Sequence, residues 1–142
     1  MILRDLPADI VLALLIWGEA RGEPVEGQIG VACVVRNRAL RSGHDWRAVM
    51  LAPFQFSCFN ADDPNFPKIS RARELLLTGT PTPQLAQALW IANGVIDGTV
   101  MDNTRGAQNY LTTDLLRSAR APRWSQHRPI LVVLGQHSFL TA

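Results

Sequence analysis

The sequence predicts a mostly helical α+β fold with one small β-hairpin at its C-terminal end. Three observations favour this class. Apolar residues recur at helical spacing through most of residues 7–97. A β-branched apolar run follows near the end of the chain, at 130–134. The length of 142 residues suits a single domain over 1–142, and a hydrophobic fraction of 47% is enough to fill a core.

Two long helices are expected first, over 7–20 and 24–40. Pro7 suits the first turn of a helix, and the apolar positions after it repeat at helical spacing. Gly22 follows the expected end of this helix, where glycine is a common stop. The second helix is apolar on two adjacent faces, which is typical of a helix buried at the centre of a domain.

The rest of the chain alternates between loops, shorter helices and the hairpin. The expected elements are a long ordered loop over 42–67 with a short helix near 46–50, helices over 69–77 and 83–97, a loop over 99–113, a short helix over 114–119, and two strands over 130–134 and 137–141. The first loop is too rich in aromatic residues for a solvated linker, and long ordered loops are often functional. An isolated hairpin is only marginally stable, so the two strands must pack on the helices.

Composition and charge exclude several functional classes. No apolar run reaches the ~20 residues of a membrane-spanning helix. The apolar N-terminal stretch is interpreted as the first helix and not as a signal peptide, because Asp5 and Asp9 disturb the charge pattern and no small-residue cleavage site follows. The net charge is only +2, and the arginines are scattered, which argues against a nucleic-acid partner.

The two cysteines show no metal-binding spacing. Cys33 lies in an apolar helical segment, which favours a buried free thiol. A disulfide between Cys33 and Cys58 stays an alternative, because the sequence does not give the distance between the two Cβ atoms.

Glu19 is the leading candidate for a general acid. It falls in the last turn of the first expected helix, at the negative end of the helix dipole, and its neighbours are apolar. Both effects favour the protonated carboxyl group that a general acid needs. Glu26 is interpreted as a first-turn partner of the helix dipole. Glu23 is interpreted as a structural residue that pairs with Arg21, or as a second carboxylate in the same cleft.

Motifs for other kinds of chemistry do not occur in the sequence. It contains no GxSxG, GxGxxG, GxxxxGK[ST] or HExxH. The three histidines, His44, His127 and His137, lie in dissimilar contexts. Neither a metal site nor a cofactor is therefore expected.

Five sequence blocks follow one another along nearly the whole chain. They are E-A-R-G-E with V-V-R-N-R in 16–38, Q-F-S-C-F at 55–59, A-x-x-V-I-D-G at 92–98, D-x-T-x-G-A-x-x-Y at 102–110, and P-x-W with L-G-Q-H-S-F in 122–139. In this order they resemble the cell-wall hydrolase family of spore-cortex-lytic (SleB-like) enzymes. The sequence departs from the family at Phe59, where a tryptophan is usual, and residues 60–68 read as a variable insertion.

The resemblance implies a lysozyme-like domain that cleaves peptidoglycan between N-acetylmuramic acid and N-acetylglucosamine, without a cofactor. It implies that Glu19 is the catalytic acid of a lytic transglycosylase, which needs one carboxylate. Glycosidases that use water need a second carboxylate about 5–9.5 Å away. The groups implied for substrate binding are the amides of Gln55 and Asn109, the hydroxyls of Ser57 and Tyr110, and the ring of Phe56.

Two alternatives stay open. One is a hydrolytic muramidase in which Glu23 or Asp102 supplies the second carboxylate. The other is a non-catalytic module that binds peptidoglycan glycan strands. A wall hydrolase with no visible signal peptide is typical of a phage or prophage endolysin, made in the bacterial cytoplasm and dependent on a holin to reach the wall.

Overall fold

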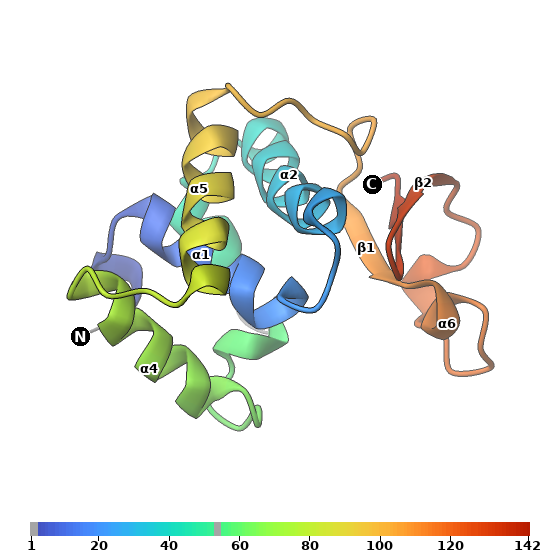
Figure 1. Cartoon of the computed structure of the whole chain (residues 1–142). Coiled ribbons are helices and arrows are strands. Elements are labelled where there is room, and N and C mark those ends of the chain that lie inside the picture. Colours follow the sequence, from blue (N-terminus) through green and yellow to red (C-terminus); the bar gives the residue numbers. More distant parts are fainter. Residues whose placement is uncertain (1–2, 53–54) are drawn as a thin grey trace.

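The computed structural model describes residues 3–52 and 55–142. The chain is mostly helical and carries one small antiparallel sheet at its C-terminal end (Figure 1). The α-helices are α1 (Ala8–Ala20), α2 (Val25–Ser42), α3 (Trp46–Met50), α4 (Phe66–Leu77), α5 (Pro83–Asp97) and α6 (Thr113–Leu116). Three short 3-10 helices are η1 (Leu3–Asp5), η2 (Ser57–Phe59) and η3 (Arg123–Ser125), and the strands are β1 (Asn109–Thr112), β2 (Ile130–Leu134) and β3 (His137–Leu140).

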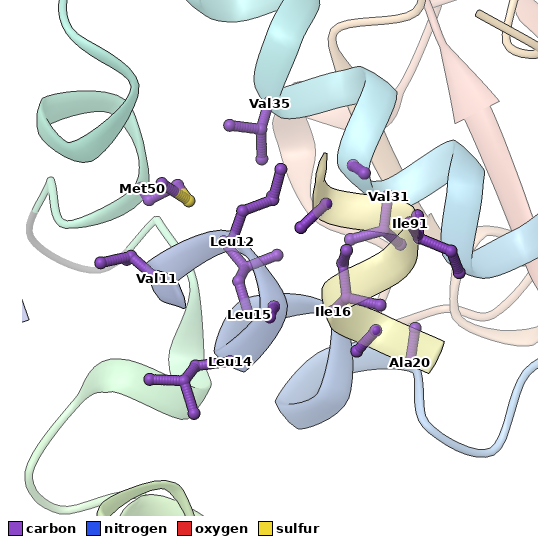
Figure 2. Close-up of a cluster of buried hydrophobic side chains, with 14 of the residues drawn as sticks. Val11, Leu12, Leu14, Leu15, Ile16, Ala20, Val31, Val35, Met50 and Ile91 are labelled. Carbon is purple, nitrogen blue, oxygen red and sulfur yellow. The ribbon is translucent and has the colours of Figure 1, made fainter. Parts of the chain in front are cut away.

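The hydrophobic core is built around α1. Leu12 and Ile16 of α1 share one buried cluster with Val31 of α2 and Ile91 of α5 (Figure 2). All four side chains are inaccessible to solvent, and removal of such apolar surface from water is the main force that holds the helices together. Burial along most of α1 fixes the position of its last turn, which carries Glu19.

The long helices agree closely with the sequence-based predictions. The prediction for α5 over 83–97 is confirmed at both ends: the Thr82 hydroxyl accepts a hydrogen bond from the Leu85 backbone N–H at 3.3 Å, and Gly98 ends the helix at φ +85°. The short helix α3 also lies where it is predicted. Prediction and structure differ by one residue at the start of α1, and α2 continues to Ser42, two residues beyond its predicted end.

The sheet is larger than the predicted hairpin. β2 and β3 form that hairpin, and Gly135 in its turn has φ +59°. β1 pairs with the other edge of β3, opposite Phe139 at Tyr110, so the strand order is β1-β3-β2. The prediction of a loop over 99–113 is therefore wrong at β1. This strand has four residues and one buried side chain, Leu111, so no alternating pattern reveals it.

Two helix boundaries also differ from the predictions. α4 begins at Phe66 and not at Ile69, because Pro67 is accepted in a first helical turn. α6 is shorter than the helix expected over 114–119 and begins one residue earlier. Residues 53 and 54 of the expected 42–67 loop lie outside the described residues. None of the described helices has the length and apolar character of a membrane span.

Both cysteines are buried free thiols, which confirms the interpretation of Cys33. Burial, and after it the negative charge of Asp102, raises the pKa of Cys33 to about 11. Burial also raises the pKa of Cys58, and the charge of Glu19 adds to that effect. Both thiols therefore stay protonated at neutral pH.

We expect neither cysteine to react quickly with iodoacetamide in the native protein at pH 8, because the thiolate is the reactive form and both sulfurs are buried. Both should react once the chain is unfolded in guanidinium chloride. Mass spectrometry counts the added groups under each condition. Rapid modification of either thiol in the native state would contradict the burial described here.

Candidate active site

Glu19 is held at the C-terminal end of α1. Arg21 follows the helix and donates hydrogen bonds from Nη1 to the carbonyl oxygens of Trp17 at 3.2 Å and Gly18 at 3.4 Å. Its Nη2 donates to Asn65 Oδ1 at 3.2 Å, which ties the helix end to the start of α4. A cation at this position satisfies carbonyl groups that have no partner inside the helix.

The Glu19 carboxyl group accepts hydrogen bonds from η2. Its Oε1 lies 3.2 Å from the backbone N of Cys58 and 3.5 Å from Ser57 Oγ. Gly18 permits this approach, since a Cβ there would lie 2.9 Å from both Cβ and Sγ of Cys58. The sequence suggested an apolar setting for Glu19, but the structure places polar donors at the carboxyl group. The side chain is half-buried, and the hydrogen bonds orient it.

Glu19 lines a cavity of about 470 Å³, which we call the acid cavity. Its walls come from α1, α2, the η2 segment, β1 and η3. All six residues that the sequence put forward as the acid and its substrate contacts line this cavity: Glu19, Gln55, Phe56, Ser57, Asn109 and Tyr110. Folding thus brings together three segments that are far apart in the sequence.

Tyr110 joins the acid cavity to the sheet. Its ring stacks on Phe56 at a centroid distance of 6.5 Å and meets His137 edge-on at 5.3 Å. Burial raises the pKa of Tyr110 well above its ordinary value, and the negative charge of Glu19 raises it further. The hydroxyl therefore stays protonated and can act as a hydrogen-bond donor. Phe56 is almost fully buried, so its ring also belongs to the core.

Arg38 fixes the β1 side of the acid cavity. Its Nε donates to the Gln108 carbonyl at 2.6 Å, and its two terminal nitrogens donate to Gln55 Oε1 and Asn109 Oδ1, each at 3.3 Å. The guanidinium also lies over the Phe56 ring at 5.3 Å. These contacts tie the end of α2 to β1 and to the segment before η2.

Three further residues line the acid cavity that the sequence analysis did not assign to substrate binding: Arg38, Trp124 and Arg128. Arg38 and Trp124 belong to motif blocks noticed in the sequence, V-V-R-N-R and P-x-W, so a signal for both existed. Arg128 lies in no such block. Its Nε donates to the Trp124 carbonyl at 2.6 Å, and its guanidinium lies 5.9 Å from the Trp124 ring.

Glu23, the candidate second carboxylate, does not line the acid cavity. Its Oε1 lies 2.7 Å from His137 Nδ1 and accepts a hydrogen bond from the Gln136 backbone N at 2.9 Å. Glu23 therefore anchors the β2–β3 turn to the α1–α2 connection. A structural role was expected, but the partner expected, Arg21, is wrong: Arg21 donates to Trp17, Gly18 and Asn65 instead. Glu23 lies outside the acid cavity because the β2–β3 hairpin folds back onto the α1–α2 connection, where Gln136 and His137 contact the Glu23 carboxylate.

Asp102 also lies outside the acid cavity and organises its own loop. The carboxylate accepts hydrogen bonds from the backbone N and hydroxyl of Thr104, at 2.8 and 2.6 Å, from Gly106 N at 2.9 Å and from Asn37 Nδ2 at 3.1 Å. Burial by itself would raise the pKa of Asp102, but the hydrogen bonds from Thr104, Asn37 and Gly106 outweigh it and hold the pKa below 3.8.

Replacement of Asp102 by alanine should lower the free energy of unfolding by about 1–3 kcal/mol near pH 7. Because folding lowers the pKa of Asp102, the charged carboxylate contributes fully above the ordinary pKa of an aspartate, and the contribution is lost as pH falls through the lower pKa of the folded state. Urea unfolding of both proteins at pH 7 and pH 3 should show the difference narrowing in acid. The exposed Asp62→Ala is the control, and a difference independent of pH would contradict the charged role.

The acid cavity combines one carboxyl group, that of Glu19, with neutral hydrogen-bonding groups and the guanidinium groups of Arg38 and Arg128. Amides and a hydroxyl offer hydrogen bonds, and the partly exposed Trp124 ring offers a flat apolar face. Among residues 3–52 and 55–142, no Asp or Glu other than Glu19 lines the cavity. Within the same ranges, no three His, Cys, Asp or Glu side chains are grouped so that they could hold a metal ion.

Comparisons with known proteins agree with the resemblance that the sequence blocks indicated. A family described as Cell Wall Hydrolase matches residues 22–140, a range that begins after Glu19. The catalytic domain of the germination-specific lytic transglycosylase SleB from Bacillus anthracis is 25% identical to this chain, with a TM-score of 0.62 over 96% of each chain. The SleB catalytic domain from Bacillus cereus is 26% identical, with a TM-score of 0.61 over 94% of this chain and 90% of that one. No curated protein matches the chain.

Proposed function

Because the chain belongs to the cell-wall hydrolase family, we propose that it cleaves peptidoglycan glycan strands as a lytic transglycosylase, with Glu19 as both acid and base. The bond cleaved joins C1 of N-acetylmuramic acid to N-acetylglucosamine. The neighbour from Bacillus anthracis is named a lytic transglycosylase, and the acid cavity offers the groups that this reaction needs.

Glu19 performs two proton transfers in this reaction. As a carboxylic acid it protonates the glycosidic oxygen, and the C1–O bond breaks with its electron pair passing to that oxygen. The carboxylate then accepts the proton of the muramic C6 hydroxyl while O6 bonds to C1. The product carries a 1,6-anhydro ring, Glu19 is protonated again, and no water is consumed.

The observation that carries the proposal is the isolation of Glu19 among neutral and cationic groups. Within the described residues, the acid cavity has no second Asp or Glu that could activate water. Ser57 and the Cys58 backbone N–H hold the Glu19 carboxyl group at the cavity wall. The Tyr110 hydroxyl and the Gln55 and Asn109 amides line the same cavity, and we assign to them the binding of N-acetyl and hydroxyl groups of the sugars.

Digestion of purified peptidoglycan separates this proposal from its alternatives. We expect muropeptides with 1,6-anhydromuramic ends, each lighter by one water than the corresponding reducing product. Liquid chromatography with mass spectrometry detects the difference, and a known hydrolytic muramidase provides the reference digest. Reducing muramic ends would favour the hydrolytic muramidase, and binding to the wall without soluble products would favour the non-catalytic module.

The role of a phage or prophage endolysin that depends on a holin stays a prediction from the sequence. The identity of the neighbouring genes in the genome tests this prediction directly. Adjacent holin or phage tail genes would support the endolysin, and a chromosomal wall-remodelling operon would support a cellular enzyme.

A further inference from the structure

A second, larger cavity of about 780 Å³ adjoins the acid cavity. Arg38, Gln55, Asn109 and Arg128 line both, so the two form neighbouring parts of one depression. We call the larger part the arginine groove, because Arg41 extends its cationic lining at the end of α2.

The charge of the arginine groove is unbalanced. Three arginines and His44 line it, together with Ala142, the last residue of the chain, and no Asp or Glu side chain does so within the described residues. Within the same residues no ion pair joins Arg38, Arg41 or Arg128 to a carboxylate. Arg38 and Arg128 are partly buried, yet their hydrogen bonds go to neutral carbonyl and amide oxygens. Arg47 differs, since it pairs with Asp45 nearby on the surface.

Partly buried guanidinium groups without a counter-charge indicate an anionic ligand. Taking a cation out of water is costly unless an anion compensates it. Burial lowers the pKa of Arg38. The backbone and amide contacts hold the guanidiniums of Arg38 and Arg128 in fixed orientations, which suits recognition of a carboxylate.

We propose that the arginine groove binds the carboxylates of the peptide attached to the muramic acid, so that the enzyme prefers peptide-bearing glycan strands. This inference rests on the proposed function. Glycan rings are neutral and fit the acid cavity, whereas the peptide on the muramic lactyl group brings carboxylates to a position beside the cleaved sugar. Because the arginine groove shares four lining residues with the acid cavity, a peptide beside the cleaved sugar can reach it and meet the complementary charge.

Three substrates made from one batch of glycan strands, freed of accessory polymers, test the proposal. The first keeps its peptides. The second is stripped of them by an amidase, and the muramic lactyl carboxylates that this leaves are converted to amides. In the third the peptides stay and their carboxylates are converted to amides. For the wild-type enzyme we expect kcat/KM to be about tenfold higher on the first than on the other two, the effect of one charge-assisted hydrogen bond.

Variants of Arg41 test whether the preference for peptide-bearing strands depends on the arginine groove. Arg41→Gln should lower the ratio of kcat/KM on peptide-bearing and stripped strands several-fold, because Arg38 and Arg128 remain, and Arg41→Lys should restore much of it. Arg71→Gln is the matched control, because it removes the same charge from an exposed position on α4 that lines neither cavity. Circular dichroism checks that each variant is folded.

The outcomes distinguish the two proposals. If no substrate is cleaved, the proposed function fails. Cleavage of all three at equal rates would overturn the arginine-groove proposal and leave the proposed function standing. An unchanged ratio in Arg41→Gln, or an equal loss in Arg71→Gln, would also overturn it. A wild-type preference that survives amidation would show that peptide bulk, and not carboxylate charge, is recognised.

Discussion

Glu19→Gln should lower the rate of peptidoglycan cleavage by about 10²–10⁴-fold, the range typical of the loss of a general acid–base group. Glutamine has nearly the same shape but no transferable proton. Its amide oxygen can still accept the hydrogen bonds from Ser57 and Cys58, so the fold should persist. The release of soluble muropeptides from purified cell walls measures the rate, and a thermal melt measures the stability.

Glu26→Gln is the matched control for this experiment. Glu26 is an exposed glutamate in the first turn of α2 and does not line the acid cavity. Its replacement should leave both activity and melting temperature close to wild type. Near-normal cleavage by Glu19→Gln would remove the assignment of Glu19, and a large drop in its melting temperature would show that the carboxylate is mainly structural.

Phe139→Ala should lower the free energy of unfolding by about 3–5 kcal/mol, as is usual for deletion of a buried aromatic ring. The Phe139 side chain is fully buried between the sheet and α2, in a cluster with Val34 and Ala107. The ring fits against Gly30, where an added Cβ would lie 2.6 Å from Phe139 Cζ. Its loss leaves a void that the tightly packed helix and strand cannot fill, and it withdraws support from Tyr110.

Urea unfolding followed by circular dichroism measures this change. Val133→Ala is the control, because Val133 lies on the neighbouring strand β2 and is 50% exposed. Its replacement should change the free energy of unfolding by less than about 0.5 kcal/mol. Similar effects of the two substitutions would contradict the packing of the sheet on α2 through Phe139.

The sequence predicted the helices well because local rules decide them. Helical spacing of apolar residues, prolines at helix starts and glycines after helix ends are all readable from neighbouring residues. β1 was missed because its hydrogen bonds go to β3, far along the chain, and its own four residues carry little pattern. A strand of this kind is specified by its partner edge.

The same division holds for the candidate site. Motif blocks put forward Glu19, Gln55, Ser57 and Tyr110, and they line one cavity. The sequence could not show that Glu23 contacts the hairpin, because this contact joins residues more than a hundred positions apart.

What the sequence determined by itself is the helical class of the fold, the resemblance to a cell-wall hydrolase family and the choice of Glu19 as candidate acid. These depend on local periodicity and on short motifs. The tertiary structure decided the third strand, the hydrogen bonds that hold Glu19 and the unbalanced charge of the arginine groove. Each of these features arises where segments that are distant in the sequence meet in the fold. The contacts between such segments depend on three-dimensional distances, which local sequence patterns do not specify.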